Sequence, residues 1–406
     1  MKRIAILLVC TIFSASFLFS QQEFQGINGI NTENYPRVDG STSTNPLNRI
    51  VAAKLLDLEY EWTSGTGGRD VIFVGEGQMS WDFRMKFKCS QTHNAIINLI
   101  DNQTDLIIVA RKMSADEREY ANNASVSLTE TPIALDALDF ILNAQNSVNS
   151  LSVEQIQNIY LGNITNWSEV GGIDDEIIPF IRNANSGSQE MMNEIVMNNT
   201  GMPDWTVSLS DAEEHTLWSM SAVYEELILH PNGICFTPHY YREYMMSNIF
   251  TADKIKTLAI NGIVADRNSI KNYIYPFVAN VYVSIRSDLD QNTMAYKLYE
   301  WLQTKSGKDV INESGYVPYG EYETNIVEQI NNQYIQILPN PTEGIIEIRG
   351  IDDYSNLTYM IYNSIGQITQ SGSLKQTIDL SNSKGLNILT IMQNQKIIAR
   401  EKIIVK

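Results

Sequence analysis

Three short stretches of the sequence place small hydroxyl side chains directly before a helical pattern, an arrangement suited to holding an anion. The first is DGSTSTNPL at 39–47. Near its end, Asn45 can cap a helix, and the proline that follows suits the first helical position. Ser41, Thr42 and Ser43 are therefore expected just before a helix N-terminus. Unpaired N–H groups and the helix dipole favour negative charge at such a position.

The second and third stretches repeat this order of strand, small polar loop and helix. Ser90 and Thr92 follow an expected half-buried strand at 85–89, in which apolar and basic residues alternate. The third stretch lies between an expected strand at 177–181 and apolar residues at helical spacing. Its candidate ligands are Ser186, Gly187 and Ser188. In open α/β sheets, ligands bind beyond the carboxyl ends of the strands, where such loops gather.

Two arginines lie close to these loops in the sequence. Arg182 precedes the third stretch, and Arg111 follows DLIIVA at 105–110, a short apolar run typical of a strand covered on both faces. An arginine can give an oxyanion a bidentate contact with a permanent positive charge. A glycine at 187 lets the backbone approach closely. We expect the following residues to form one anion site: Ser41, Thr42, Ser43, Ser90, Thr92, Arg111, Arg182, Ser186, Gly187 and Ser188.

Each of these features also has a simpler interpretation. A single hydroxyl-rich loop before a helix is usually only a cap, and a single arginine is more often solvated than bound to a ligand. The glycine-rich stretch at 65–68 lacks the Gly-Lys-Ser/Thr ending of a nucleotide phosphate loop, which favours a turn in an inserted loop. The histidines show no metal-ligand spacing and no G-x-S-x-G motif occurs. We therefore predict no metal, no cofactor and no catalysis.

The composition limits the kinds of partner. The chain has 406 residues, enough for about two or three domains, and 43% of them are hydrophobic, enough for a sizeable core. Its formal net charge of -18 argues against nucleic acid and anionic membranes as partners. The same charge repels an anion at long range, so binding has to depend on local dipoles, N–H groups and arginines in a cleft.

The N-terminus has the pattern of a secretory signal peptide. Residues 1–20 combine a basic start with an apolar run that is short for a membrane span. We therefore expect cleavage near residue 20, a linker at 21–34 and no transmembrane segment. The mature chain keeps Cys89 and Cys235, which could form a disulfide or remain as two free thiols.

The character of the chain changes once. Residues 35–322 alternate strand and helix patterns, with S-x-x-E/Q capping boxes that begin at Ser114, Ser152 and Ser186. This alternation predicts an α/β fold with mostly parallel sheets. Residues 323–333 are polar and are expected to form a linker. Residues 334–406 show short strand patterns and turns, which predicts a small all-β sandwich.

The α/β region resembles the periplasmic phosphate-binding proteins of ABC phosphate transporters. The likeness depends on DGSTSTNPL at 39–47, LSVEQIQNIYLGNITNWSEVGG at 151–172, PFIRNANSGSQEMM at 179–192 and YPFVANVYV at 275–283. It implies a two-lobed, type II periplasmic-binding-protein-like fold, with a second lobe at about 132–260, that closes on an anion like a hinge. By motif position, the resemblance makes ligands of Thr42, Ser43, Arg182, Ser186, Gly187 and Ser188.

One position departs from this family. Phosphate carries a proton at neutral pH, so selectivity over sulfate requires a carboxylate acceptor. Well-known members of the family place an aspartate after the strand that here ends in DLIIVA, where this chain has Arg111. Either Asp39 accepts the proton or the site is less selective for phosphate. We favour phosphate over sulfate-like oxyanions.

The C-terminal region resembles the sorting domain of type IX secretion substrates. The likeness depends on ILPNPTEGIIEI at 337–348, YMIYNSIGQI at 359–368 and the closing segment 385–406, although Asn387 stands where family members usually carry an aromatic residue. It implies export by the type IX machinery of a Bacteroidetes-type bacterium, to the medium or the outer-membrane surface.

These observations together predict a secreted, monomeric solute-binding protein that captures inorganic phosphate, or a related oxyanion, between two lobes. Two alternatives stay open. One is an enzyme that acts on phosphoesters with the same scaffold, and the other is a surface interaction protein with a vestigial cleft.

Overall fold

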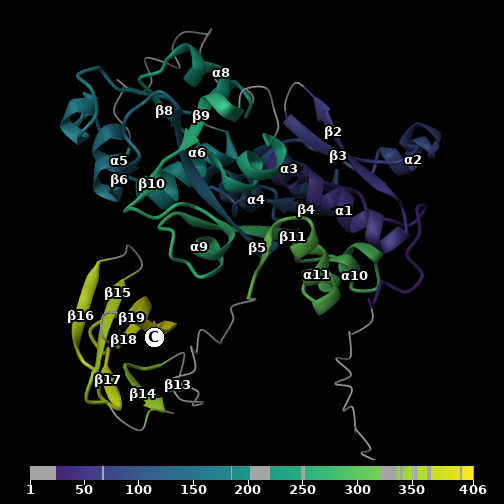
Figure 1. The fold of residues 1–406 in the computed structure, drawn as a ribbon. Coiled ribbons are helices and arrows are strands. Elements are labelled where there is room, and N and C mark those ends of the chain that lie inside the picture. Colours follow the sequence, from purple (N-terminus) through teal and green to yellow (C-terminus); the bar gives the residue numbers. More distant parts are fainter. Residues whose placement is uncertain are drawn as a thin grey trace, which may run out of the picture.

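The fold consists of an α/β region followed by two small β-sheets (Figure 1). The structure is a computed structural model that describes residues 24–65, 68–183, 185–201, 220–247, 252–320, 336–338, 342–349, 351, 354–363, 367–393 and 396–405. Within them, the predicted two-lobed α/β architecture with a C-terminal β unit is confirmed. The predicted signal peptide at 1–20 and the linker at 323–333 lie outside the described residues.

The sequence pattern predicts mostly parallel sheets, but the central sheet is mixed. Its strand order is β1 (Val38–Gly40), β4 (Leu106–Val109), β11 (Val278–Arg286), β5 (Leu128–Asn143), β8 (Gly233–Pro238) and β7 (Ile178–Pro179). The short strands β12 (Val317–Pro318) and β9 (Ile255–Thr257) also pair with β5. Only the β1–β4 and β7–β8 pairs of this sheet are parallel, because β5 and β11 cross the molecule in opposite directions.

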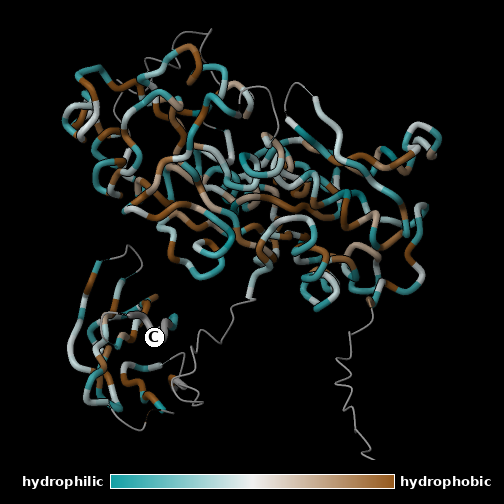
Figure 2. Tube along the Cα trace, in the orientation of Figure 1, coloured by the Kyte–Doolittle hydropathy of each residue, from teal (hydrophilic) through white to brown (hydrophobic). Residues whose placement is uncertain are grey.

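Strand β5 connects the two lobes. Its first part pairs with β11 from Leu128 to Ala137, and its last part pairs with β8 from Leu138 to Leu142. The hydrophobic stretches in Figure 2 follow these central strands, and the four residues of β4 are all buried. One continuous strand therefore holds the sheet ends of both lobes in register, and the loops at those ends face a shared region.

The helices surround this sheet. They are α1 (Asn45–Leu56), α2 (Trp81–Arg84), α3 (Thr92–Ile100), α4 (Ala115–Asn123), α5 (Val153–Tyr160), α6 (Gly187–Met191), α8 (Ala222–Leu229), α9 (Arg267–Lys271), α10 (Met294–Trp301) and α11 (Lys305–Glu313). Two π-helical turns, η4 (Met192–Val196) and η5 (Tyr241–Met245), follow α6 and β8. The remaining strands form the pairs β2 (Tyr60–Gly65) with β3 (Gly68–Phe73) and β6 (Ser150–Leu151) with β10 (Ala259–Ile260).

Helix starts follow the predicted capping signals in two of three cases. The capping boxes at Ser114 and Ser152 are confirmed. The third is wrong, because Ser186 makes no side-chain cap and Gln189 instead accepts a hydrogen bond from the N–H of Arg182 at 2.8 Å. Asn45 is the first residue of α1 rather than its cap, since a 3₁₀ turn, η1 (Thr42–Thr44), precedes the helix.

The predicted strand at 85–89 is also wrong. Met85 ends helix α2, and Phe87 forms only an isolated bridge with Val38. Phe87 lies among Phe83 and other aromatic rings, at a centroid distance of 5.3 Å from the ring of Phe83. Packing of these aromatic side chains decides the local conformation, and the alternating pattern does not.

The C-terminal unit contains two sheets with one core. The sheets are β13 (Gln336–Leu338), β14 (Ile345–Arg349) and β17 (Thr377–Asp379), and β16 (Ile368–Ser373), β15 (Leu357–Asn363), β18 (Gly385–Gln393) and β19 (Lys396–Val405). Ile346 and Ile378 of the first sheet belong to the same buried cluster as Ile361 and Leu389 of the second. This packing is that of a small sandwich.

Cys89 and Cys235 are both free thiols. Of the helices in the described residues, none is long and apolar enough to cross a bilayer.

Candidate functional site

A cavity of about 200 Å³ lies where the loops of the two lobes meet. The first lobe lines it with the loop after β1, the start of α3 and the residue after β4. The second lobe lines it with Arg182, the start of α6, the two residues before α8, the end of β8 and the start of η5. The lining residues are Ser41, Thr42, Ser43, Gln91, Thr92, Ala110, Arg182, Ser186, Gly187, Ser188, Met220, Ser221, Pro238 and Tyr241.

Most of the residues predicted for the anion site lie around this cavity. The structure brings together Ser41, Thr42, Ser43, Thr92, Arg182, Ser186, Gly187 and Ser188. It does not place Ser90 or Arg111 in the lining. Whether the residues in the lining contact a ligand stays a prediction.

The first loop is fastened tightly to strand β4. A Cβ atom at Gly40 would lie 2.4 Å from the carbonyl oxygen of Ile108, so only glycine fits at this close approach of β1 and β4. The Thr44 hydroxyl donates to the same carbonyl at 2.6 Å, and the Tyr316 hydroxyl donates to the Ser43 carbonyl at 2.9 Å. These bonds hold the N-terminal end of α1 toward the cavity.

Ser41 joins three elements of the first lobe. Its Oγ accepts a hydrogen bond from the N–H of Ala110 at 3.0 Å and lies 2.8 Å from Oγ1 of Thr92. The loop after β1, the end of β4 and the start of α3 are therefore locked together. Ser41 is 3% exposed and Thr92 is also 3% exposed, so both hydroxyls are shielded from bulk water.

The two lobes are in direct contact where Gly187 of the second lobe lies against Thr92 of the first. A Cβ atom at this position would lie 2.2 Å from Oγ1 and 3.0 Å from Cβ of Thr92. The hydroxyls of Ser186 and Ser188 lie 2.9 Å apart on either side of this contact. The lobes thus meet directly beside the cavity, and any larger residue at 187 would force them apart.

Arg182 is the only charged residue among the described lining residues. It is 6% exposed, and this burial lowers the pKa of its guanidinium. Tyr241, which also lines the cavity, is buried, and burial raises the pKa of its phenol well above the usual range. A buried cation surrounded by hydroxyl groups favours an anion over a neutral ligand.

Arg111 has a different role from the predicted one. Its two terminal nitrogens donate to the carboxylate of Glu117 at 2.7 and 2.9 Å, and one also donates to the Lys112 carbonyl. Burial alone would raise the pKa of Glu117, but the hydrogen bonds and charge of Arg111 outweigh it and hold that pKa below the usual range. The charge of Arg111 is therefore already balanced by Glu117. The pair stabilises the loop between β4 and α4.

Ser90 lies outside the cavity lining and forms hydrogen bonds with groups of β1 and α3. Its N–H donates to Oδ1 of Asp39 at 2.9 Å, and its hydroxyl accepts from the side-chain amide of Asn98 at 3.2 Å. These contacts fasten the chain before α3 to β1. The prediction that Ser90 faces the anion is not supported by this placement, since the cavity lining begins one residue later, at Gln91.

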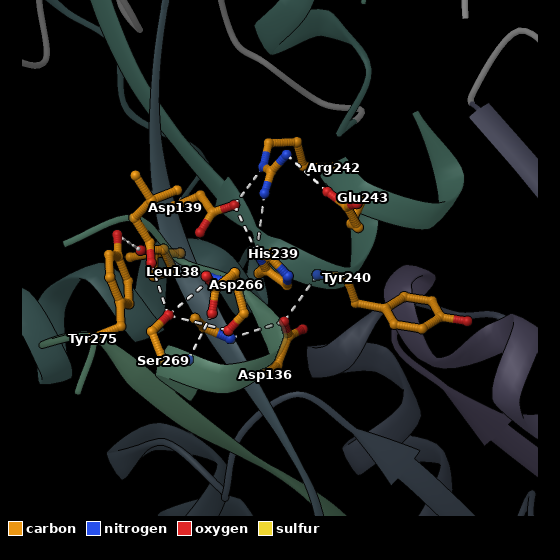
Figure 3. A network of polar contacts seen from close by, with 12 residues as sticks. Asp136, Leu138, Asp139, His239, Tyr240, Arg242, Glu243, Asp266, Ser269 and Tyr275 are labelled. Atoms are coloured by element: carbon orange, nitrogen blue, oxygen red, sulfur yellow. Dashed lines mark hydrogen bonds and ion pairs between the residues drawn. The ribbon is translucent and has the colours of Figure 1, made fainter. Parts of the chain in front are cut away.

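A buried polar network joins β5 to the residues that follow β8 (Figure 3). On β5, Asp136 accepts a hydrogen bond from the N–H of Tyr240 at 2.9 Å, and Asp139 pairs with His239 at 3.1 Å and with Arg242. His239 and Tyr240 stand between Pro238 and Tyr241, which line the cavity. The network therefore fixes the turn after β8 against the strand that crosses between the lobes.

Six lining residues were not anticipated from the sequence. They are Gln91, Ala110, Met220, Ser221, Pro238 and Tyr241. Ala110 ends the apolar run DLIIVA and Pro238 ends β8, so the rule that sites lie beyond strand ends could have indicated both. No local signal marks the others. Within the described residues, no group of three or more His, Cys, Asp or Glu side chains is placed to hold a metal ion.

Comparison with known proteins gives consistent matches. The model of the PBP superfamily domain matches residues 80–376. The phosphate-binding protein PstS of Borreliella burgdorferi is 19% identical over 248 residues, which are 61% of this chain and 84% of that protein. PstS of Bacillus subtilis is 22% identical over 205 residues, which are 50% of this chain and 61% of that protein.

Solved structures with a similar chain include two proteins that are described with phosphate transport. A putative phosphate ABC transporter substrate-binding protein from Clostridium perfringens, with bound phosphate, has a TM-score of 0.48 and 19% identity, over 69% of this chain and 98% of its own. An ABC-type phosphate transport receptor from Vibrio cholerae has a TM-score of 0.47 and 20% identity, with the same coverage. Because the superfamily model spans more than half of its residues, the chain belongs to the PBP superfamily.

Proposed function

We propose that the protein captures inorganic phosphate, or a related tetrahedral oxyanion, in the cavity between its two lobes and performs no chemistry on it. The observation that carries this proposal is the convergence of hydroxyl groups from both lobes on one cavity that also contains Arg182. Two relatives that bear the name phosphate-binding protein support it.

In this proposal, the lining residues of the two lobes contribute different groups to the anion. Thr42 and Ser43 offer hydroxyl and N–H donors from the first lobe, and Ser186, Gly187 and Ser188 offer them from the second. Arg182 supplies the positive charge. Donors from both lobes contact one anion only when the lobes are together, so binding favours the closed arrangement.

We also propose that the protein acts outside the cytoplasm as a monomer. The signal-peptide pattern at 1–20 and the resemblance of 334–406 to a type IX sorting domain support export to the medium or the outer-membrane surface of a Bacteroidetes-type bacterium. The shared core of the two C-terminal sheets is compatible with a separately recognised sorting unit.

Isothermal titration of the purified protein with sodium phosphate tests the binding function. We expect saturable binding that Arg182→Ala weakens at least about tenfold, because the variant removes the charge from a buried site; tenfold corresponds to about 1.4 kcal/mol. Arg37→Ala is the matched control, since the Arg37 side chain is 44% exposed and pairs with Asp105 outside the cavity. Absence of phosphate binding to the unmodified protein would refute the proposal, and equal affinity in Arg182→Ala would refute the role of Arg182.

A further inference from the structure

We propose that the cavity does not select phosphate by its proton, and that it therefore binds sulfate with an affinity similar to that for phosphate. This inference rests on the proposed function, because it concerns the same cavity. It follows from the way in which the carboxylates near the cavity, among the residues that the structure describes, are already engaged.

The proton is the chemical difference between the two ions. Phosphate keeps at least one proton near neutral pH, whereas sulfate has none. A carboxylate in the binding site accepts a hydrogen bond from that proton, and it repels sulfate because two anionic oxygens then face each other without a proton between them. A site without such a carboxylate presents the same donors to both ions.

Asp39 is close to the first loop, but its carboxylate is fully engaged within its own lobe. Oδ1 accepts hydrogen bonds from the N–H groups of Gly40 at 2.8 Å and Ser90 at 2.9 Å. Oδ2 accepts from the side-chain amide of Asn98 at 2.8 Å. Asp39 is 0% exposed and does not line the cavity. It therefore holds β1 to α3 and is not placed to receive a proton from a bound anion.

Glu117 is the other buried carboxylate near this edge of the first lobe. Both of its oxygens accept hydrogen bonds from Arg111, and Oε1 also lies 2.9 Å from Nδ1 of His93. The N–H of Ser114 donates to Oε2 at 2.7 Å. This carboxylate is neutralised and saturated, and it does not line the cavity either.

The lining itself offers acceptors of another kind. Among the described lining residues there is no aspartate or glutamate, and the acceptors are hydroxyl, amide and carbonyl oxygens. A hydroxyl can rotate to accept a hydrogen bond from the P–OH group of phosphate or to donate one to an oxygen of sulfate. Phosphate is therefore accommodated, but nothing in this part of the cavity disfavours the fully ionised ion.

Paired titrations of the same protein preparation with sodium phosphate and sodium sulfate at pH 7.5 and matched ionic strength test the inference. We expect the two dissociation constants to agree within about tenfold. Sulfate binding more than about a hundredfold weaker than phosphate binding would overturn the inference and leave the proposed function intact. If neither ion binds, the proposed function fails and the inference fails with it.

A gained carboxylate gives a second test. Gln91→Glu places an acceptor in the lining with almost no change in side-chain shape. We expect this variant to lose at least about ten times more affinity for sulfate than for phosphate. Gln103→Glu adds the same charge to the same lobe outside the lining, and should change the ratio little. Equal losses for both ions in Gln91→Glu would count against selection by a carboxylate in this cavity.

Discussion

At the scale of single residues, the site depends on positions where two parts of the backbone come unusually close. Gly40 allows β1 to approach β4, and Gly187 allows the second lobe to meet Thr92 of the first. Hydroxyl groups near these positions can then reach the same cavity from opposite sides. The absence of a side chain at Gly187 matters as much as the donors beside it.

Replacement of Gly187 by alanine should weaken phosphate binding at least about tenfold. The new Cβ would lie 2.2 Å from Oγ1 of Thr92, so the lobes could not approach as closely and the two sets of donors could not meet. Isothermal titration measures the loss. Gly77→Ala is the control, because a Cβ there meets nothing within 4 Å. An unchanged dissociation constant in Gly187→Ala would show that the contact is not needed for binding.

At the scale of elements, strand β5 has two functions. It pairs with strands of both lobes, and it carries Asp136 and Asp139 under the turn that forms one wall of the cavity. Both carboxylates are buried. Asp139 pairs with His239 and Arg242, and Asp136 accepts from the N–H of Tyr240 between them in the chain. Protonation of this cluster should therefore change the stability of the connection between the lobes.

The sign of the pH dependence follows from the pKa shifts. Burial raises the pKa of Asp136 from 3.8 to about 6, despite the opposing charge of His239. Burial alone would lower the pKa of His239, but the negative charges of Asp139 and Asp136 outweigh it and raise that pKa. Both shifts are upward, so each group stabilises the fold at low pH and this contribution is lost as pH rises. For Asp136 the loss occurs between about pH 4 and 6.

Asp136→Asn should remove this loss. The variant keeps an oxygen that can accept from the N–H of Tyr240 but cannot ionise, so relative to the unmodified protein it should gain about 2 kcal/mol in unfolding free energy between pH 4.5 and 7. Urea unfolding at the two pH values measures the change. Asp101→Asn, at an exposed position, should show no such gain. A gain equal to that of the control would mean that Asp136 does not titrate in this window.

At the scale of the whole molecule, the net charge opposes the proposed function. A formal charge of -18 repels an incoming anion, and in the proposed site the hydroxyl and N–H donors and Arg182 have to offset this repulsion inside the cavity. The repulsion acts at long range and is screened by salt, whereas the contacts inside the cavity are screened much less. Net charge should therefore affect the association rate more than the dissociation rate.

The association rate constant for phosphate should consequently rise with ionic strength. The Debye length falls from about 30 Å at 0.01 M to about 8 Å at 0.15 M, which removes most of the repulsion between the approaching anion and distant carboxylates. Stopped-flow tryptophan fluorescence at increasing potassium chloride concentrations measures the rate. A rate that falls as salt is added would instead indicate that a local positive field steers the anion into the cavity.

Local signals in the chain are enough to specify the separate elements of the site. Hydroxyl-rich loops before helix N-termini and the apolar run of β4 are set by neighbouring residues, and the structure places these loops around one cavity. The α/β organisation followed by a β unit could also be predicted, because the change from alternating strands and helices to short strands occurs along the chain. The division into two lobes was implied by the resemblance to phosphate-binding proteins and not by this pattern.

Which charged groups line the cavity depends on contacts that form only on folding. Arg111 and Arg182 look equivalent in sequence, but Arg111 is engaged by Glu117, and Asp39 is engaged by groups at the start of α3 and within it. The mixed strand directions likewise depend on the pairing of β5 with β11, segments that lie far apart in the chain. Such choices follow from competition among partners that meet only on folding, and no short pattern contains that information.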